Sequence, residues 1–427
     1  MGEKVVVMKI LVILGNYMPN PHANGICTDQ VIRNLQKRGH EVHVLCYGNS
    51  INECKPEVLN DVYIHRIRRF QKYKMPSEYG RSFMSRFLPI CKKWMVRLKL
   101  LLFLPVYPLN SLVLVSSFYR KANSLHKLEY YDALIAVCNP LEAVVSGALL
   151  KKKNRNIKSV MYVLDTLTCN PKKSFLSGWL NWSGWLWEKR LYKVYDLIIN
   201  MNSYLDNYNN KRYDRFRNKI RFSDIPLLMD EWKPEVKKPT KKSSYKWLYT
   251  GKLDMHSRNP EYLCKLLLLD ETLNKHEIHF YSYGNCENMI LRYSAKSSGR
   301  IHQHGYVSRD KIIEELNEAD ILVSIGNKDS KMVPSKIFEY ISTGKKIIHF
   351  YQNENDSCLV YLKKYKNALL INEKEETSKN IQKIKHFIDR PSMVIANKDI
   401  DILYEANKPS YTANIIEELL ISNSTRG

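Results

Sequence analysis

The sequence predicts an α/β fold made of two Rossmann-like, doubly wound domains. Short apolar runs alternate with helical patterns through the first half of the chain, which is typical of a parallel sheet with helices on both faces. The same alternation starts again after a segment rich in Pro, Lys and Ser at 232–246. A chain of 427 residues is also too long for one ordinary hydrophobic core, which favours two domains.

In the first half, the helix TDQVIRNLQKRGH at 28–40 is expected to end at Gly39, a residue favoured just after a helix C-terminus. The apolar runs expected to form strands lie at 5–15, 41–47, 61–67, 132–137, 157–165 and 196–201.

In the second half, the alternation predicts a strand, a helix, a strand, and then a helix followed by two more strands. The expected segments are 245–253, 258–269, 277–284, 311–318, 319–326 and 346–350. We therefore expect a first domain at 1–232, a linker at 233–244, a second domain at 245–408, and a C-terminal helix at 409–427 that can pack back on the first domain.

The segment PSKIFEYISTGKKII at 334–348 carries the most functional information. Ser335 is a favoured helix N-cap, and Gly344 is a favoured C-cap. The helix N-terminus attracts anions, and Lys336 adds a positive charge beside it. Glu339, one turn further, is placed to accept hydrogen bonds from sugar hydroxyls, so the segment suggests a nucleotide-sugar site. The alternative is a lysine and a glutamate on a solvated helix face.

This segment, together with ADILVSIG at 319–326, resembles the donor site of retaining GT-B glycosyltransferases of family 4, including members that make bacterial surface polysaccharides. That family carries two glutamates eight positions apart. Glu339 matches the second, and Lys331 stands where the first is expected. The resemblance implies two domains facing across a cleft. It also implies donor-binding roles for Ser335, Lys336 and Ile337 and a catalytic role for Glu339.

Two further segments of the second half resemble the same family. TGKLDMHSRNPEYL at 250–263 places Lys252 and Arg258 where the family has cations that neutralise the departing diphosphate. Gly251 beside them is implied in donor binding, as are Tyr283 and Gly284 in the following glycine turn. Lys252 and Arg258 could instead be ordinary solvated cations of a basic protein.

The first half offers fewer candidates. Asn24 and Gly25, in the loop predicted at 16–27 after the first strand, match the family's glycine-containing loop, and a glycine there lets backbone come close to a ligand. Asp165 follows a predicted strand, where it could hold an acceptor hydroxyl, stabilise positive charge, or simply cap the strand end. Glu188 resembles a family position in a helix, with a structural role.

The resemblance thus implies transfer of a sugar from a nucleotide-diphosphate sugar to a saccharide or lipid-linked saccharide. Retention of the anomeric configuration would follow from front-side attack with the leaving phosphate as base. No metal and no cofactor are expected. The alternatives are an inverting transferase, a nucleotide-sugar epimerase, an inactive GT-B scaffold subunit suggested by Lys331, and a basic nucleic-acid-binding protein.

The charge distribution and the cysteine content bear on nucleic-acid binding and on the cellular compartment of the protein. Residues 1–240 contain 39 Lys and Arg against 19 Asp and Glu, whereas residues 241–427 contain 28 against 24, so the net charge of +24 lies mainly in the first half. No RNP, KH or zinc-knuckle pattern supports nucleic acid as the partner. Nine cysteines without a C-x-x-C pair indicate reduced thiols, and the start predicts no signal peptide. We expect a cytoplasmic protein.

The basic excess has a local source at residues 66–99, which hold eleven Lys and Arg and only Glu78 among acids. Phe, Trp and Met side chains are interleaved with these cations. Basic and aromatic residues on amphipathic helices favour adsorption to anionic lipid. The apolar run at 100–115 is broken by prolines and is too short to cross a bilayer about 30 Å thick. We expect peripheral binding at the inner face of the membrane, unless the segment is a buried helix with a solvated basic face.

Liposome sedimentation tests the membrane prediction. Binding should require anionic lipid and weaken, without vanishing, in high salt, because the charges are screened while inserted aromatic side chains are not. Charge reversal at Arg86, Lys92, Lys93 and Arg97 should reduce it. Equal and poor recovery on anionic and neutral vesicles would contradict the prediction.

Overall fold

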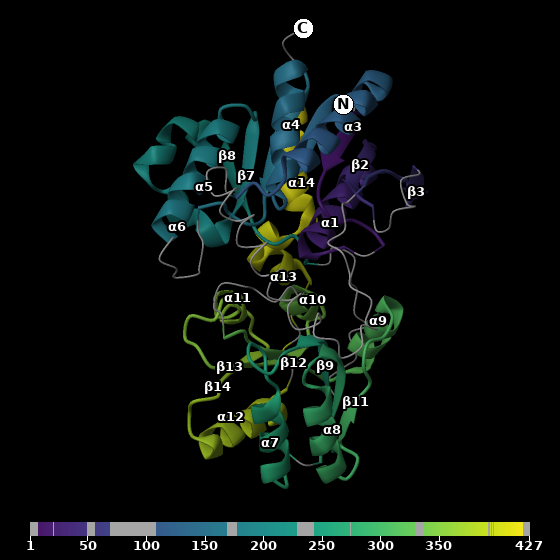
Figure 1. Ribbon diagram of the computed structural model, residues 1–427. Helices are drawn as coiled ribbons and strands as arrows, with labels where there is room; N and C mark the ends of the chain where they lie inside the picture. Colours follow the sequence, from purple (N-terminus) through teal and green to yellow (C-terminus); the bar gives the residue numbers. More distant parts are fainter. Residues whose placement is uncertain are drawn as a thin grey trace, which may run out of the picture. The chain divides into compact units, whose positions relative to one another are not determined.

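The computed structural model describes residues 7–19, 21–48, 56–68, 108–168, 177–228, 243–273, 275–328, 336–391, 393, 395 and 397–421. The chain divides into two compact units (Figure 1). The first unit comprises Met1–Pro226 and Pro409–Gly427, and the second comprises Leu227–Lys408. Most of the predicted linker, residues 233–242, lies outside the described residues.

The described part of the first unit contains an eight-stranded sheet in which all neighbours are parallel except β3 and β4. Apolar residues on both faces of a strand such as β1 indicate that helices cover both sides of the sheet. Its strands, in spatial order, are β3 (Glu57–Leu59), β4 (Val62–Ile67), β2 (Glu41–Tyr47), β1 (Lys9–Ile13), β5 (Ala133–Val137), β6 (Lys158–Val163), β7 (Leu197–Met201) and β8 (Ile220–Ser223).

Helices cover this sheet on two sides. Leu11 and Ile13 of β1 share a core with Phe118 of one helix, whereas Ile10 and Val12, equally buried, point to the opposite face. Within the described residues, the helices of the first unit are α1 (Ala23–Lys37), α3 (Leu112–Glu129), α4 (Leu141–Lys153), α5 (Ser177–Tyr192), α6 (Leu205–Tyr208) and α14 (Pro409–Ile421), with 3₁₀ turns at Asn202–Tyr204 and Lys211–Lys219.

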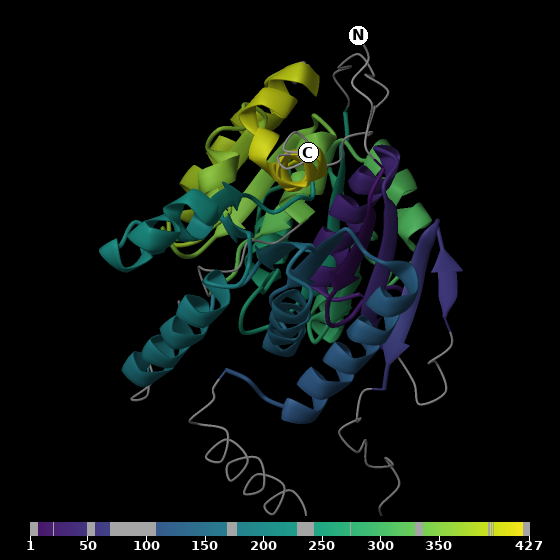
Figure 2. The same ribbon diagram turned by 90° about the horizontal axis from the view of Figure 1, so that it is seen from above.

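The C-terminal helix α14 belongs to the first unit although the whole second unit precedes it in the chain. Figure 1 and Figure 2 show it, in yellow, beside the purple α1, and it also contacts β6 and β8. Arg38, just after α1, forms an ion pair with Glu417 and donates a hydrogen bond to the backbone oxygen of Ser410 at 3.1 Å. The helix therefore covers strands that would otherwise expose an apolar face.

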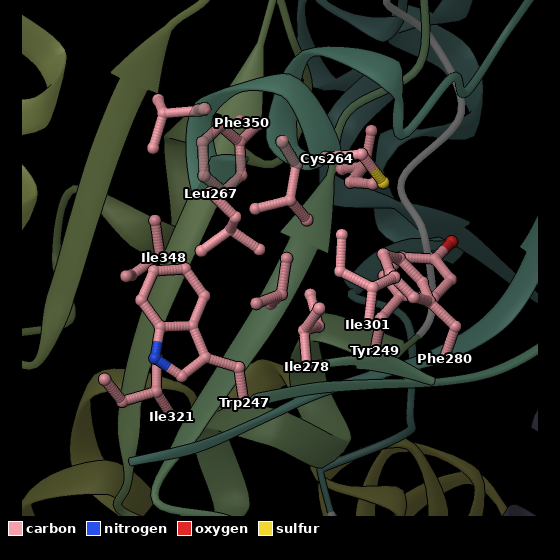
Figure 3. Close-up of a cluster of buried hydrophobic side chains, with 14 of the residues drawn as sticks. Trp247, Tyr249, Cys264, Leu267, Ile278, Phe280, Ile301, Ile321, Ile348 and Phe350 are labelled. Carbon is pink, nitrogen blue, oxygen red and sulfur yellow. The ribbon is translucent and has the colours of Figure 1, made fainter. Parts of the chain in front are cut away.

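The second unit contains a six-stranded, fully parallel sheet within its described residues. Figure 3 shows its core, in which the fully buried indole of Trp247 packs among aliphatic and aromatic side chains. In spatial order the strands are β11 (Ile301–Gln303), β10 (Glu277–Gly284), β9 (Lys246–Leu253), β12 (Ile321–Ile325), β13 (Lys346–Tyr351) and β14 (Ala368–Asn372). The helices are α7 (Glu261–Leu269), α8 (Glu287–Lys296), α9 (Arg309–Glu318), α10 (Lys336–Ser342), α11 (Leu359–Leu362), α12 (Thr377–Asp389) and α13 (Asn397–Leu403), with a 3₁₀ turn at Glu405–Asn407.

The two Rossmann-like, doubly wound sheets confirm the predicted fold class. Three details differ. The helix α1 begins at Ala23, so Asn24 and Gly25 lie in its first turn and not in a loop. The helix α7 begins at Glu261, and Arg258 precedes it in an isolated β-bridge with Asp254. In addition, β3, β8, β11 and β14 are strands of three to five residues that were not predicted.

The basic segment at 66–99 lies almost wholly outside the described residues, because only 66–68 are described. Arg66 is buried and forms an ion pair with Glu57, so its charge does not contribute to an exposed basic face. Across the described ranges, no helix combines the length and the apolar character that crossing a bilayer requires.

Candidate functional site

The candidate site in the second unit lies where the strand order of the sheet reverses. The chain passes from β9 to β10 on one side, while β12 pairs with the other side of β9. In open parallel sheets, ligands bind outside the carboxyl ends of the strands at such a reversal. Lys252 lies at the end of β9, and Arg258 and Asn327 lie in the segments that follow β9 and β12. Glu339 lies on α10, the helix after β12.

Glu339 is the centre of an ion-pair group on α10. Its carboxylate is 6% exposed, accepts a hydrogen bond from Lys336 Nζ at 2.8 Å, and forms a second ion pair with Arg309 at the start of α9. Lys336 lies three residues before Glu339, one helical turn away, but sequence reasoning did not predict their contact. Arg309 was missed because it lies thirty residues away in the chain. Glu339 is therefore a buried, doubly paired carboxylate and not a solvated helix-face residue.

Gly251 brings β9 close to α10. Its backbone has φ +129°, and a Cβ at this position would lie 3.9 Å from Lys336 Cγ. The neighbouring Thr250 donates its backbone N–H to the hydroxyl of Tyr340 on α10 at 2.9 Å. Lys252, exposed at the end of β9, thus lies beside the helix that carries Lys336 and Glu339.

Arg258 is held in place by three hydrogen bonds. Its Nε and Nη2 donate to Asn327 Oδ1 at 3.1 and 2.9 Å, and Nη1 donates to the backbone oxygen of Lys252 at 3.3 Å. Asn327 follows β12, so the guanidinium connects the segments after the two strands that flank the reversal. Sequence reasoning missed Asn327, although its position directly after a buried strand could have identified it.

Tyr283 and Gly284 lie at the end of β10. A Cβ at Gly284 would lie 2.0 Å from the backbone oxygen of Leu253, and φ is +128°, so only glycine fits there. Tyr283 is 49% exposed and meets Tyr306, which is 81% exposed, edge to face at 5.7 Å between ring centroids. These aromatic rings offer an exposed stacking surface at the same edge of the sheet.

Two further residues of the 334–348 segment, Ser335 and Ile337, were predicted to bind the donor. Ile337 is fully buried in the core, so its side chain cannot contact a ligand. Ser335 and Lys331 lie outside the described residues.

A small pocket adjoins Asn327 at the carboxyl ends of β12, β13 and β14. Gln352 donates a hydrogen bond to Glu373 at 2.5 Å, and burial raises the pKa of Glu373 above its usual range. Sequence reasoning did not identify this pocket. Its lining residues are Ser257, Asn259, Ile325, Gly326, Asn327, Lys328, Tyr351, Gln352 and Glu373.

In the first unit, the structure brings Asn24 and Asp165 together. Asn24 Nδ2 donates to Asp165 Oδ2 at 3.2 Å, and Asn139 Nδ2 donates to the same oxygen at 3.3 Å. Only glycine fits at position 25, because a Cβ there would lie 2.4 Å from the backbone oxygen of Asn16. These groups follow β1, β5 and β6, where the order of the first sheet reverses.

Glu188 on α5 supports the segment that carries Asp165. Its carboxylate is fully buried and accepts hydrogen bonds from the hydroxyls of Tyr213 at 2.7 Å, Thr166 at 3.3 Å and Thr168 at 3.3 Å. Burial raises the pKa of Glu188 to about 6, against the lowering effect of the Tyr213 hydroxyl. Glu188 is thus a buried anchor for residues 166–168.

The raised pKa of Glu188 predicts a pH dependence of stability. The folded protein holds this proton more tightly than the unfolded chain, whose glutamates titrate near 4.5. The stabilisation is therefore complete below about pH 4.5 and is lost as the pH rises through about 6, a change of about 2 kcal/mol. Urea unfolding of the wild type and Glu188→Gln at pH 4.5 and pH 7, followed by the fluorescence of the α5 tryptophans, measures it.

The two proteins should differ in how their free energy of unfolding changes between these pH values. An Asp206→Asn variant, which alters an exposed carboxylate on α6, serves as the control. A Glu188→Gln protein with the same pH dependence as the wild type would show that Glu188 titrates normally.

Comparisons with known proteins identify the fold. No protein-family model matches the chain, and no curated protein matches its sequence. The solved structures that match share the GT-B fold, and several of them are glycosyltransferases. The sucrose-phosphate synthase from Thermosynechococcus elongatus matches with a TM-score of 0.58 at 11% identity, covering 98% of this chain and 100% of that one.

Two other matching structures are a protein in complex with UDP-glucose and an epimerase. A protein from Anabaena in complex with UDP-glucose has a TM-score of 0.56 at 12% identity, with 97% of this chain and 100% of that chain covered. The UDP-GlcNAc 2-epimerase from Methanocaldococcus jannaschii has a TM-score of 0.57 at 10% identity, with coverages of 96% and 99%. At such low identity these likenesses show the GT-B fold, which both transferases and an epimerase share.

Proposed function

We propose that this protein is a glycosyltransferase that uses a nucleotide-diphosphate sugar, with the diphosphate bound at the carboxyl edge of the second unit's sheet. The observation that carries the proposal is the placement of Lys252, Arg258 and Lys336 at the strand-order reversal beside the buried Glu339. Three cations around one edge suit a diphosphate, whose charge grows as it departs. The GT-B fold of the neighbours, one of them in complex with UDP-glucose, supports the same donor class.

Each residue has a definite task in this proposal. Arg258, fixed by Asn327, offers a preorganised guanidinium to the phosphates, and Lys252 and Lys336 add positive charge. The Glu339 carboxylate already accepts from Lys336 and Arg309. A carboxylate has about four lone-pair sites, so it can also accept a hydrogen bond from a sugar hydroxyl. Asp165, with Asn24 and Asn139 on one oxygen, offers its other oxygen to an acceptor hydroxyl.

The finer features of the proposal rest on the family resemblance of the sequence. We infer retention of the anomeric configuration, a saccharide or lipid-linked acceptor in surface polysaccharide synthesis, and catalysis without a metal or cofactor. The basic segment at 66–99 supports a location at the inner face of the membrane.

An epimerase is the second candidate, because the epimerase from Methanocaldococcus jannaschii has the same fold. Product analysis by NMR separates the two. A transferase releases a nucleoside diphosphate and forms a glycoside whose anomer shows retention or inversion, whereas an epimerase returns a nucleotide sugar. Nucleotide binding without either product would indicate a scaffold subunit.

A thermal-shift screen with UDP, GDP, CDP and ADP is the first experiment. One of the four should raise the melting temperature, because a ligand that binds only the folded state stabilises it. If none does, the second unit has no nucleoside-diphosphate site under these conditions, and the proposal is wrong.

With the nucleotide identified, Arg258→Ala and Lys336→Ala should each weaken its binding by about 1–3 kcal/mol, as expected for a charge-assisted hydrogen bond. Isothermal titration calorimetry measures the change. Arg292→Ala on α8 is a matched control, because it removes an exposed guanidinium outside this group. Unchanged affinity in both site variants would place the diphosphate elsewhere.

Glu339→Gln should lower turnover roughly 10- to 100-fold, because the amide cannot accept the sugar hydroxyl as strongly as a carboxylate. Lys336 and Arg309 are 36% and 49% exposed, so water can solvate them in the variant, and stability should fall by only about 1 kcal/mol. Steady-state kinetics and urea unfolding separate the two effects, with Glu314→Gln on α9 as the control. Full activity would reduce Glu339 to a structural ion-pair partner.

A further inference from the structure

Three histidines and a glutamate gather at the β10–β11 edge of the second unit's sheet. His279 on β10 pairs in register with His302 on β11, and Glu277 lies two residues before His279. Ile278 and Ile301, labelled in Figure 3, point into the core on one face of the sheet. Because side chains alternate along a strand, Glu277, His279 and His302 share the opposite face.

The geometry of these three side chains is that of a set of metal ligands. One ligand atom from each lies within 4.8 Å of those of the other two. His279 Nε2 is 3.5 Å from a carboxylate oxygen of Glu277. Two ligands bound tetrahedrally to zinc, at bond lengths of about 2.0–2.2 Å, are separated by about 3.4 Å. The two imidazole rings are stacked, with centroids 4.5 Å apart.

Two ring nitrogens in this group lack the partners that buried polar atoms normally have. Nε2 of His279 and Nε2 of His302 are inaccessible to solvent and make no hydrogen bond with any described residue. Most buried polar atoms in proteins are hydrogen-bonded, so two unpartnered nitrogens side by side call for an explanation. A bound cation would accept both lone pairs.

A fourth residue orients one of the ligands. His279 Nδ1 and His304 Nε2 are 3.0 Å apart. In the tautomer that carries the proton on His279 Nδ1, this nitrogen donates to His304 and the Nε2 lone pair of His279 is available. Metal-bound histidines characteristically donate their second nitrogen in this way. The nearby Lys246 does not oppose a cation strongly, because Glu315 and Glu318 each neutralise it at 2.8 Å.

Two other groups of potential ligands in the described residues are less suited. The Glu41, His43 and Glu129 group already holds a cation, because Lys9 Nζ lies 3.0 Å from Glu41 and 2.8 Å from Glu129. His349, Asp356 and Cys358 are all buried, which closes the path by which an ion would enter. Glu277 is exposed and His279 and His302 are half-buried, so an ion can approach this group from the side of the Glu277 carboxylate.

We propose that Glu277, His279 and His302 bind a divalent transition-metal ion, with zinc as the best fit to two imidazoles and a carboxylate. The ion joins the short edge strand β11 to β10 and stabilises the second unit. This site is independent of the proposed glycosyl transfer, which uses no metal.

Zinc titration of the full-length, untagged and chelator-treated protein tests the proposal. Calorimetry should show one site that is lost in His302→Gln and in Glu277→Gln, while zinc raises the melting temperature of the wild type only. Replacement with Co²⁺ should give the visible absorption of a four-coordinate ion. His304→Gln, which removes the orienting partner, should weaken binding roughly 10- to 100-fold without abolishing it.

His386→Gln is the matched control, because it removes an exposed histidine of the same unit on α12 and should bind zinc like the wild type. Circular dichroism without metal establishes that each variant is folded. If His302 cannot be replaced without unfolding, Glu277→Gln decides, since that side chain is exposed. Zinc binding of equal affinity and stoichiometry in the wild type and the ligand variants would overturn the proposal.

Discussion

The candidate donor site depends on one polar contact inside the second unit. The hydroxyl of Tyr340 accepts the backbone N–H of Thr250 at 2.9 Å and lies 3.0 Å from the Thr250 hydroxyl. This contact joins α10 to the last residues of β9, and it is fully buried, where a lost partner would cost about 1–3 kcal/mol. It fixes how the first turn of α10, with Lys336 and Glu339, lies beside Gly251. The rest of α10 reinforces that position, because Ile337, Phe338 and Ile341 are core residues.

The first unit uses a buried carboxylate for a comparable purpose. Glu188 accepts hydrogen bonds from Thr166, Thr168 and Tyr213 and so holds the segment that follows Asp165. Exposed polar groups at a sheet edge are difficult to position, because water competes for every contact they make. In both units a buried polar group just behind the edge makes contacts that water cannot replace. Asp165 in one unit and Glu339 in the other are thereby placed by residues that a ligand need not contact.

The sequence predicts the central strands and the side chains that follow them, because a long apolar run bounded by Gly or polar residues is a local signal. Glu339 was found from its place in the helix after such a run, whereas Lys252 and Arg258 were identified from the family resemblance. Asn327 was overlooked although it directly follows a buried strand. Arg309 was not found, because it meets Glu339 only through the packing of distant segments. The histidine group was missed for the same reason, since His279 and His302 become neighbours only when β11 pairs with β10. The strands β3, β8 and β11 have only three or four residues, too few for a period of two residues to distinguish them from loops.

The two halves of the chain carry their positive charge differently, and each distribution attracts a different kind of anion. Residues 241–427 have a net charge of only +4, yet Lys252, Arg258, Lys336 and Arg309 lie on segments at the carboxyl edge of one sheet. The second unit therefore offers an anion a local positive field through the placement of these side chains. Asn327 orients Arg258, and Glu339 orients Lys336 and Arg309. The first half of the chain, at +20 over residues 1–240, carries an excess that no single site requires. A broad excess favours extended anionic surfaces through long-range attraction that salt screens, whereas preorganised cations favour one compact anion. The two distributions therefore act differently: a broad excess acts over an extended surface, whereas the cations of the second unit act at one edge of one sheet.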